Sequence, residues 1–165
     1  MSDPYERNLV NSDFYHSKAD ISCRIVVVLE GMLDNRGLNL IRPISRAFSK
    51  GTVIELIGTD DPNAMPGRKV DKISYIGFVE LSESGVLLVG DEVQWKGKPI
   101  GRIAGFDDTH MPNHQNTIVY LKKRISGKEL GINLNDEITI KGFNNKELSS
   151  TEEEKVITSK KIKGK

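Results

Sequence analysis

Residues 73–97 read ISYIGFVELSESGVLLVGDEVQWKG and contain three short apolar segments separated by turn residues. The first segment, Ile73–Leu81, is rich in β-branched and aromatic residues, which favour a strand, and Gly77 inside it predicts a bulge or bend. Two further segments, VLLV at 86–89 and VQW at 93–95, follow after serine- and glycine-containing turns. Short strands at this spacing predict an all-β sandwich or barrel.

The same pattern continues in both directions along the chain. Residues 23–30 (CRIVVVLE) form a nearly continuous apolar run, which is typical of a strand buried on both faces. Further strands are predicted over residues 38–42, 52–57, 100–106, 117–123 and 137–141. Only residues 44–49 (ISRAFS) suggest a helical turn. We therefore predict one all-β domain over residues 21–143, a small closed barrel with about six strands in its core and some extra strands.

An internal repeat supports this prediction. VGDEVQWKG at 89–97 and LNDEITIKG at 134–142 share Asp, Glu, Lys and Gly at four positions. In each copy the second residue, Gly90 or Asn135, can take a left-handed conformation, and the Asp after it can bind backbone amides two residues further on. The repeat predicts a turn that leads into a strand twice, as in a barrel with two related halves. The alternative is that such nonapeptides recur by chance in β proteins.

Composition restricts the class of protein. The chain has 165 residues, 24 basic and 23 acidic side chains, a net charge of +1 and 37% hydrophobic residues. Because basic and acidic side chains nearly balance, the chain has no strong positive electrostatic field that would attract nucleic acid. Basic and aromatic residues also do not alternate along any predicted strand, so we expect no nucleic-acid partner. The longest apolar run, residues 25–29, is too short to span a membrane, and the first ten residues lack the pattern of a signal peptide. We expect a soluble cytoplasmic protein, with Cys23 as a small buried hydrophobic residue.

The two ends of the chain differ from the middle. Residues 1–20 form a polar leader with a net charge of −2, and residues 144–165 carry six lysines against four glutamates. The second segment has few large apolar residues, so we predict a basic, flexible and disordered tail. Thr151 and Glu154 have the spacing of a capping box, so a short helix there is the alternative.

The densest polar stretch is DDTHMPNHQN at 107–116, between two predicted strands. Polar loops on a rigid scaffold often carry function, so we take its polar side chains as candidates for ligand binding. These candidates are Asp107, Asp108, His110, Asn113, His114 and Asn116. Imidazoles and carboxylates suit a divalent transition metal, with His110 and His114 as its ligands, or acid–base chemistry. The alternative is a hydrophilic loop whose side chains bind its own backbone.

Residues 44–142 resemble a known family in the order of their features. Four stretches carry the similarity: SRAFSKGTVIELIGTDDPN, ISYIGFVELSESGVLLVGDEV, PIGRIAGFDDTHMPNHQNTIVYLK and LGINLNDEITIKG. They are similar to the enzyme IIA component of the glucitol/sorbitol phosphotransferase system. The resemblance implies a small cytoplasmic bacterial β-barrel.

The sequence departs from that family at the residue that matters most for its activity. The family carries its phosphoryl group on a histidine in the strand that matches Ile73–Leu81, where this chain has Tyr75, Ile76 and Gly77. A relay needs an imidazole nitrogen as the nucleophile, so phosphoryl transfer is not expected to carry over.

Three functions remain open from the sequence. The first is a non-enzymatic relative of the phosphotransferase component that binds a small polar metabolite or a partner protein through residues 107–116. The second is a small metal-assisted enzyme in which Asp107, Asp108, His110 and His114 supply ligands or a general base. The third is a structural module that forms a homodimer through exposed strand edges. No particular cofactor is predicted.

Overall fold

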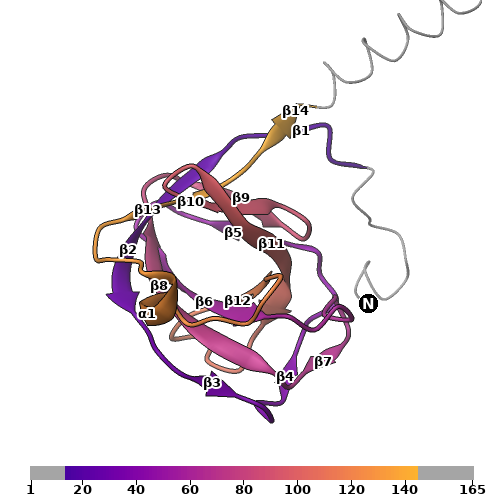
Figure 1. Cartoon of the computed structure of the whole chain (residues 1–165). Coiled ribbons are helices and arrows are strands. Elements are labelled where there is room, and N and C mark those ends of the chain that lie inside the picture. Colours follow the sequence, from indigo (N-terminus) through magenta and orange to yellow (C-terminus); the bar gives the residue numbers. More distant parts are fainter. Residues whose placement is uncertain (1–13, 145–165) are drawn as a thin grey trace, which may run out of the picture.

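A closed barrel of seven strands forms the centre of the computed structural model, which describes residues 14–144 (Figure 1). In the order in which the strands pair, they are β2 (Ile21–Val28), β13 (Glu137–Ile140), β10 (Glu92–Trp95), β11 (Lys98–Asp107), β12 (Asn116–Tyr120), β6 (Val53–Thr59) and β8 (Ile73–Leu81). The ring closes because β8 pairs back onto β2. All neighbours are antiparallel except β12 and β6, which are parallel. The predicted all-β barrel is confirmed, with seven strands in its ring where about six were expected.

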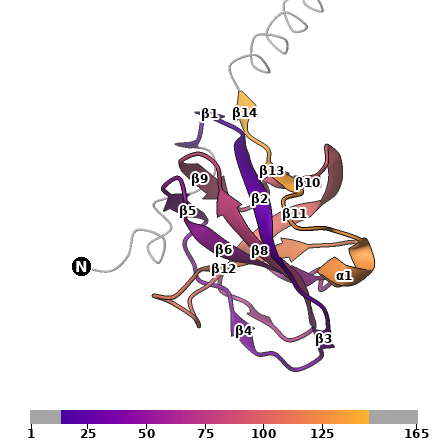
Figure 2. The ribbon, with the colours of Figure 1, turned by 90° about the vertical axis from the view of Figure 1, so that its left-hand side faces the viewer.

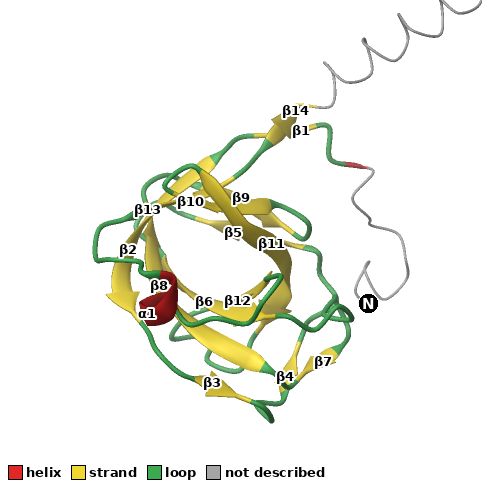
Figure 3. Cartoon of the chain, viewed as in Figure 1, coloured by secondary structure: helices red, strands yellow, loops and turns green. Residues whose placement is uncertain are grey.

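Short elements surround this barrel. Strand β3 (Met32–Leu33) adds to β8 outside the ring. Three pairs of short strands lie beside it: β1 (Ser17–Lys18) with β14 (Phe143–Asn144), β4 (Leu38–Asn39) with β7 (Lys69–Val70), and β5 (Ser45–Phe48) with β9 (Gly85–Leu88). Figure 2 shows the β1–β14 pair at the opposite end of the molecule from β3 and β4. The α-helix of the described residues is a single short turn, α1 (Gly127–Leu130), as Figure 3 shows.

Two apolar clusters hold these layers together. The larger cluster lies inside the barrel and is built from residues such as Ile54, Leu56 and Phe106, none of which is exposed to solvent. The smaller cluster, which contains Leu38 and Ile57, joins the outer face of the ring to β4 and β7. Ile54, Leu56 and Ile57 all come from β6, so this strand is buried on both of its faces.

The two copies of the repeat lie side by side, because β10 and β13 pair with each other. Gly90 and Asn135 both have positive φ values, +95° and +68°, as the sequence predicts. The carboxylates of Asp91 and Asp136 differ from the prediction: each accepts a hydrogen bond from the amide three residues before it, at 2.9 and 2.8 Å. Each copy of the repeat therefore forms the same turn, and the turn is closed by a hydrogen bond from an amide before the Asp and not from one after it.

One local prediction is confirmed and another is wrong. Strand β8 has a bulge beside Gly77, because Ile57 pairs with Tyr75 while Leu56 pairs with Gly77, leaving one residue unpaired. The helical turn expected at residues 44–49 is instead strand β5. Its four residues pair along the whole length of β9, and these long-range hydrogen bonds outweigh the weak local preference of so short a segment.

Several expectations concern residues that the structure does not describe. The disordered tail and its alternative helix from Thr151 lie in residues 145–165, and most of the polar leader lies in residues 1–13. Of the leader's remaining residues, Ser17 and Lys18 form β1. Among residues 14–144 we find no helix with the length and hydropathy needed to cross a membrane.

Candidate functional site

A row of side chains crosses the outer face of the barrel from β11 to β8. Asp107 on β11 pairs with Asn116 on β12, Asn116 pairs with Glu55 on β6, and Glu55 pairs with Phe78 on β8. Neighbouring residues of a strand point to opposite faces, so Glu55 points outward because Ile54 beside it lies in the barrel core. The predicted polar loop leaves the barrel at one end of this row and returns to it beside Glu55.

Asp107 holds the base of this loop. Its Oδ1 accepts hydrogen bonds from the Thr109 amide at 2.9 Å and from Asn116 Nδ2 at 3.1 Å, and its Oδ2 accepts one from the Asn39 amide at 2.9 Å. Burial alone would raise the pKa of Asp107, but these hydrogen bonds together lower it below its ordinary value. The carboxylate is therefore an ionised anchor for the backbone.

Asp108 also holds the loop in place through hydrogen bonds. Both of its carboxylate oxygens accept hydrogen bonds from Arg46 at 3.0 Å, and Oδ1 also accepts one from Gln115 Nε2 at 2.8 Å. Asp107 and Asp108 were both candidate metal ligands from the sequence. Their oxygens are engaged in holding the loop, and neither residue belongs to the group of potential ligands described next.

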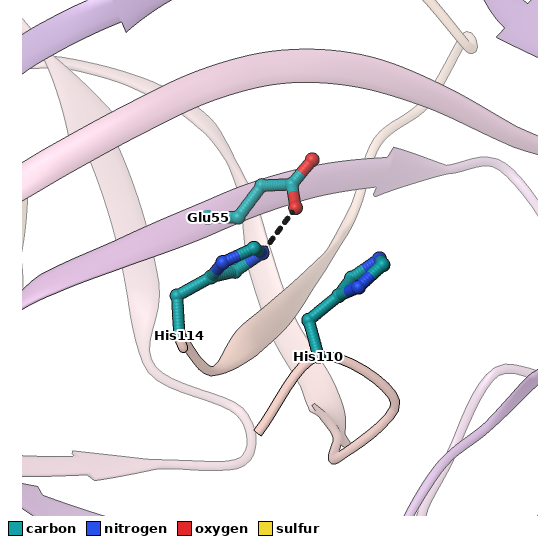
Figure 4. Close-up of side chains that lie close together, drawn as sticks. All are labelled: Glu55, His110 and His114. Atoms are coloured by element: carbon teal, nitrogen blue, oxygen red, sulfur yellow. Dashed lines mark hydrogen bonds and ion pairs between the residues drawn. The ribbon is translucent and has the colours of Figure 1, made fainter. Parts of the chain in front are cut away.

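Glu55, His110 and His114 do come together (Figure 4). Each offers one potential ligand atom, and these atoms lie within 4.8 Å of one another. His114 Nε2 is 2.9 Å from Glu55 Oε2, and the two imidazole rings stack with their centroids 5.0 Å apart. Phe78 packs its ring edge to face with His114 at 4.9 Å, so this part of the cluster rests against the barrel wall.

The second nitrogen of His114 is also engaged. Its Nδ1 lies 2.6 Å from Asn113 Oδ1, an oxygen that can only accept a hydrogen bond. With Asn113 Oδ1 as an acceptor on the Nδ1 side, the other ring nitrogen, Nε2, is the one that faces the Glu55 carboxyl group. A metal ion between Nε2 and Glu55 would be held by both groups.

Arg36 lies beside the cluster and contacts His110. Its guanidinium group lies 3.1 Å from His110 Nε2, and because arginine can only donate, this nitrogen accepts the hydrogen bond. An arginine beside the cluster also provides a positive charge that can bind an anionic group.

The sequence identified only part of this site. His110 and His114 lie together, Asn113 supports His114, and Asn116 and Asp107 form the base of the loop. Asn116 Oδ1 is buried without a hydrogen-bond partner among residues 14–144. Glu55 and Arg36 were missed, although Glu55 gave a signal: it is the single charged residue within the apolar run TVIELI.

Cys23 lies outside this site. Its side chain is 2% exposed, and burial raises the pKa of its thiol to about 12. This agrees with its expected role as a small buried hydrophobic residue.

Comparison with models of protein families gives a match over most of the chain. A family model described as "Family of unknown function (DUF6917)" matches residues 15–141, a range that contains the whole barrel and every residue of the cluster. No curated protein and no solved structure matches the chain.

Proposed function

The chain belongs to the DUF6917 family, a family of unknown function, and we propose that it binds a divalent transition-metal ion between Glu55, His110 and His114. The observation that carries this proposal is the convergence of three ligand atoms within 4.8 Å of one another. Two ligands of a tetrahedral zinc ion, each about 2.1 Å from the metal, lie about 3.4 Å apart. Small movements of the side chains would bring the three atoms to that spacing, and His110 is the exposed member of the three.

The surroundings of His114 also support the proposal. Histidines that bind a metal usually donate their other ring N–H to a carbonyl or carboxylate, which fixes the tautomer and the orientation of the ring. Asn113 Oδ1 supplies such an acceptor at 2.6 Å. The side chains of His114 and Glu55 are only 13% and 7% exposed, so an ion between them would be largely shielded from water.

Two imidazoles and one carboxylate form a ligand set that suits zinc and, among other metals, ferrous iron. Three protein ligands leave at least one coordination position open. A water molecule or a small polar ligand would bind there, with the Arg36 guanidinium close by to attract an anionic group. Metal binding and the recognition of a small polar molecule are then two aspects of one site.

The test is metal binding by protein purified without an affinity tag. We expect isothermal titration calorimetry to give one Zn²⁺ per chain and thermal melts to show a higher Tm with Zn²⁺. His110→Ala should abolish both effects without loss of the fold, because His110 is exposed. His16→Ala is the matched control, since His16 is exposed and lies outside the cluster.

Two results would count against the proposed metal site. Protein that contains no metal and whose Tm does not change with zinc, manganese or nickel would contradict the proposal. Equal loss of binding in His16→Ala would show that the histidines bind metal only as isolated surface groups.

We do not propose a phosphoryl relay, despite the resemblance to the enzyme IIA component. The strand that matches the family's phosphoryl-carrying segment is β8, which has Tyr75, Ile76 and Gly77 in the place of a histidine. Incubation with a phosphorylated phosphocarrier protein should leave this chain unlabelled. Phosphate on His110 or His114 would reverse this conclusion.

A further inference from the structure

A cavity of about 500 Å³ opens at the far end of β11 and β12 from the metal-ligand cluster. Its walls come from the start of β11, from the segment that follows β12, and from α1. The loop with the two histidines joins the other ends of the same two strands. Since β12 has five residues, each rising about 3.3 Å, the two places are separated by roughly 15 Å along the strand.

The floor of the cavity is apolar and firmly held. It is lined by Ile100, Leu121, Ile125 and Leu130. Leu121 is part of the main core, and the other three pack against that core. A cavity of this volume with apolar walls has the size and character of sites that bind small organic molecules.

The rim of the cavity is basic. It contains Arg102, Lys122, Lys123 and one acidic residue, Glu92. Glu92 is already engaged, because it accepts a hydrogen bond from Gln94 at 2.7 Å and lies 3.7 Å from Arg102. Arg102 also donates to the Gly90 carbonyl at 2.9 Å.

The positive charges of Lys122 and Lys123 are not balanced in this way by an acidic side chain. Both are exposed, and neither forms an ion pair with any residue in the described part of the chain. The rim therefore keeps two uncompensated positive charges above an apolar floor. An occupant that matches both features has an apolar body and an anionic group at one end.

We propose that this cavity binds an amphipathic organic anion, with its apolar part on the floor and its anionic group between Lys122 and Lys123. This site is separate from the metal-ligand cluster and does not depend on it. An uncharged or cationic molecule of the same shape would gain the apolar contact but lack the ionic one.

Three probes with the same alkyl chain test this proposal: decanoate, 1-decanol and decyltrimethylammonium. We expect decanoate to bind one-to-one, with a Kd at least about tenfold lower than that of either other probe. In ¹⁵N-resolved NMR spectra, the amides that shift should belong to residues 99–102 and 121–130.

Matched variants separate the ionic contact from the apolar one. Lys122→Gln combined with Lys123→Gln should weaken decanoate binding about tenfold and leave 1-decanol binding unchanged. The control is Lys50→Gln combined with Lys69→Gln, two exposed lysines that do not line the cavity, which should bind decanoate as the parent does. His110→Ala should also leave decanoate binding intact, so failure of the metal proposal would not affect this result.

Three results would overturn the proposal. Equal binding of the three probes would mean an apolar groove without preference for an anion. Unchanged decanoate binding in the Lys122/Lys123 double variant would mean that these lysines take no part. No binding of decanoate at millimolar concentration would mean that the cavity does not receive such a ligand.

Discussion

Asn113 contacts the ring of His114, and we expect this contact to influence the affinity of the proposed metal site. Its Oδ1 lies 2.6 Å from His114 Nδ1, while Nε2 of the same ring faces Glu55. Acceptors of this kind, one step away from a metal, typically contribute 10- to 100-fold in affinity. Asn113 is exposed, so the fold does not depend on its side chain.

We therefore expect Asn113→Ala to weaken Zn²⁺ binding about 10- to 100-fold, as measured by competition with a chelator of known affinity. Asn63→Ala is the control, because Asn63 is another exposed loop asparagine and lies outside the cluster. Unchanged affinity in Asn113→Ala would mean that the other contacts of His114, with Glu55, His110 and Phe78, fix its orientation without Asn113.

Asp107 makes the stability of the loop depend on pH. Because its pKa is lowered in the folded state, its stabilising effect is present above the ordinary value of 3.8 and is lost as the pH falls through the folded value. Asp107→Asn replaces an acceptor by a donor in front of backbone amides, which should reduce the free energy of unfolding by about 1–3 kcal/mol at neutral pH.

Urea denaturation at neutral pH and at about pH 3 measures this effect. The difference between the parent and Asp107→Asn should shrink at the lower pH, because the parent's carboxyl group is then increasingly protonated. A difference that stays constant with pH would show that Asp107 acts through its shape and not its charge.

At the scale of elements, close contact between β8 and β2 depends on Gly77. A Cβ atom at this position would collide with the Val27 carbonyl oxygen, which belongs to the backbone and cannot move aside alone. At Gly105 a Cβ would instead meet the side chain of Leu40, at 2.9 Å. A side chain can change rotamer more easily than a paired strand can shift.

Gly77→Ala should therefore lower the free energy of unfolding by about 1–3 kcal/mol, and by more than Gly105→Ala does. Chemical denaturation of the two variants and the parent provides the comparison. A larger loss in Gly105→Ala would mean that packing between Leu40 and β11, and not barrel closure at β2 and β8, is the more sensitive contact.

The strands that could be predicted from sequence are those with a strong local pattern. Strands β2 and β8 carry long runs of β-branched and aromatic residues, and the turns of the repeat carry Gly90 and Asn135. Strand β4 lies within the strand predicted over residues 38–42. Strands β3 and β7 have two residues each and could not be predicted, because their conformation comes only from partners far away in the chain. Strand β5 was mistaken for a helical turn for the same reason.

The residues of the candidate site could likewise be predicted only in part from the sequence. The two histidines stand out in the loop because they are polar residues close together in sequence. Glu55 lies 59 positions before His114, and only the parallel pairing of β12 with β6 brings the two together. No local pattern contains this information, because parallel strands are joined through long connections.

At the scale of the whole molecule, the closed ring protects Cys23. This residue lies on β2, between β13 and β8, and a reagent can reach it only when the ring opens. Its raised pKa, about 12, also leaves almost no thiolate at neutral pH.

We expect Cys23 not to react with Ellman's reagent in native buffer and to react completely in denaturant. The rate at intermediate denaturant concentrations should follow global unfolding as measured by circular dichroism. Rapid labelling in native buffer would show that β2 separates from its neighbours without unfolding of the barrel.

The parallel contact between β6 and β12 has a consequence for the order of folding events. Contacts between distant parts of a chain form slowly, because the loop entropy is lost before the contacts are gained. The proposed ligands lie on both sides of this contact, Glu55 on β6 and the histidines just before β12. The metal site would therefore be completed after the rate-limiting step, so Zn²⁺ should slow unfolding in stopped-flow experiments while leaving the refolding rate nearly unchanged. In kinetic terms, the ion would stabilise the folded barrel against unfolding and would not nucleate its folding.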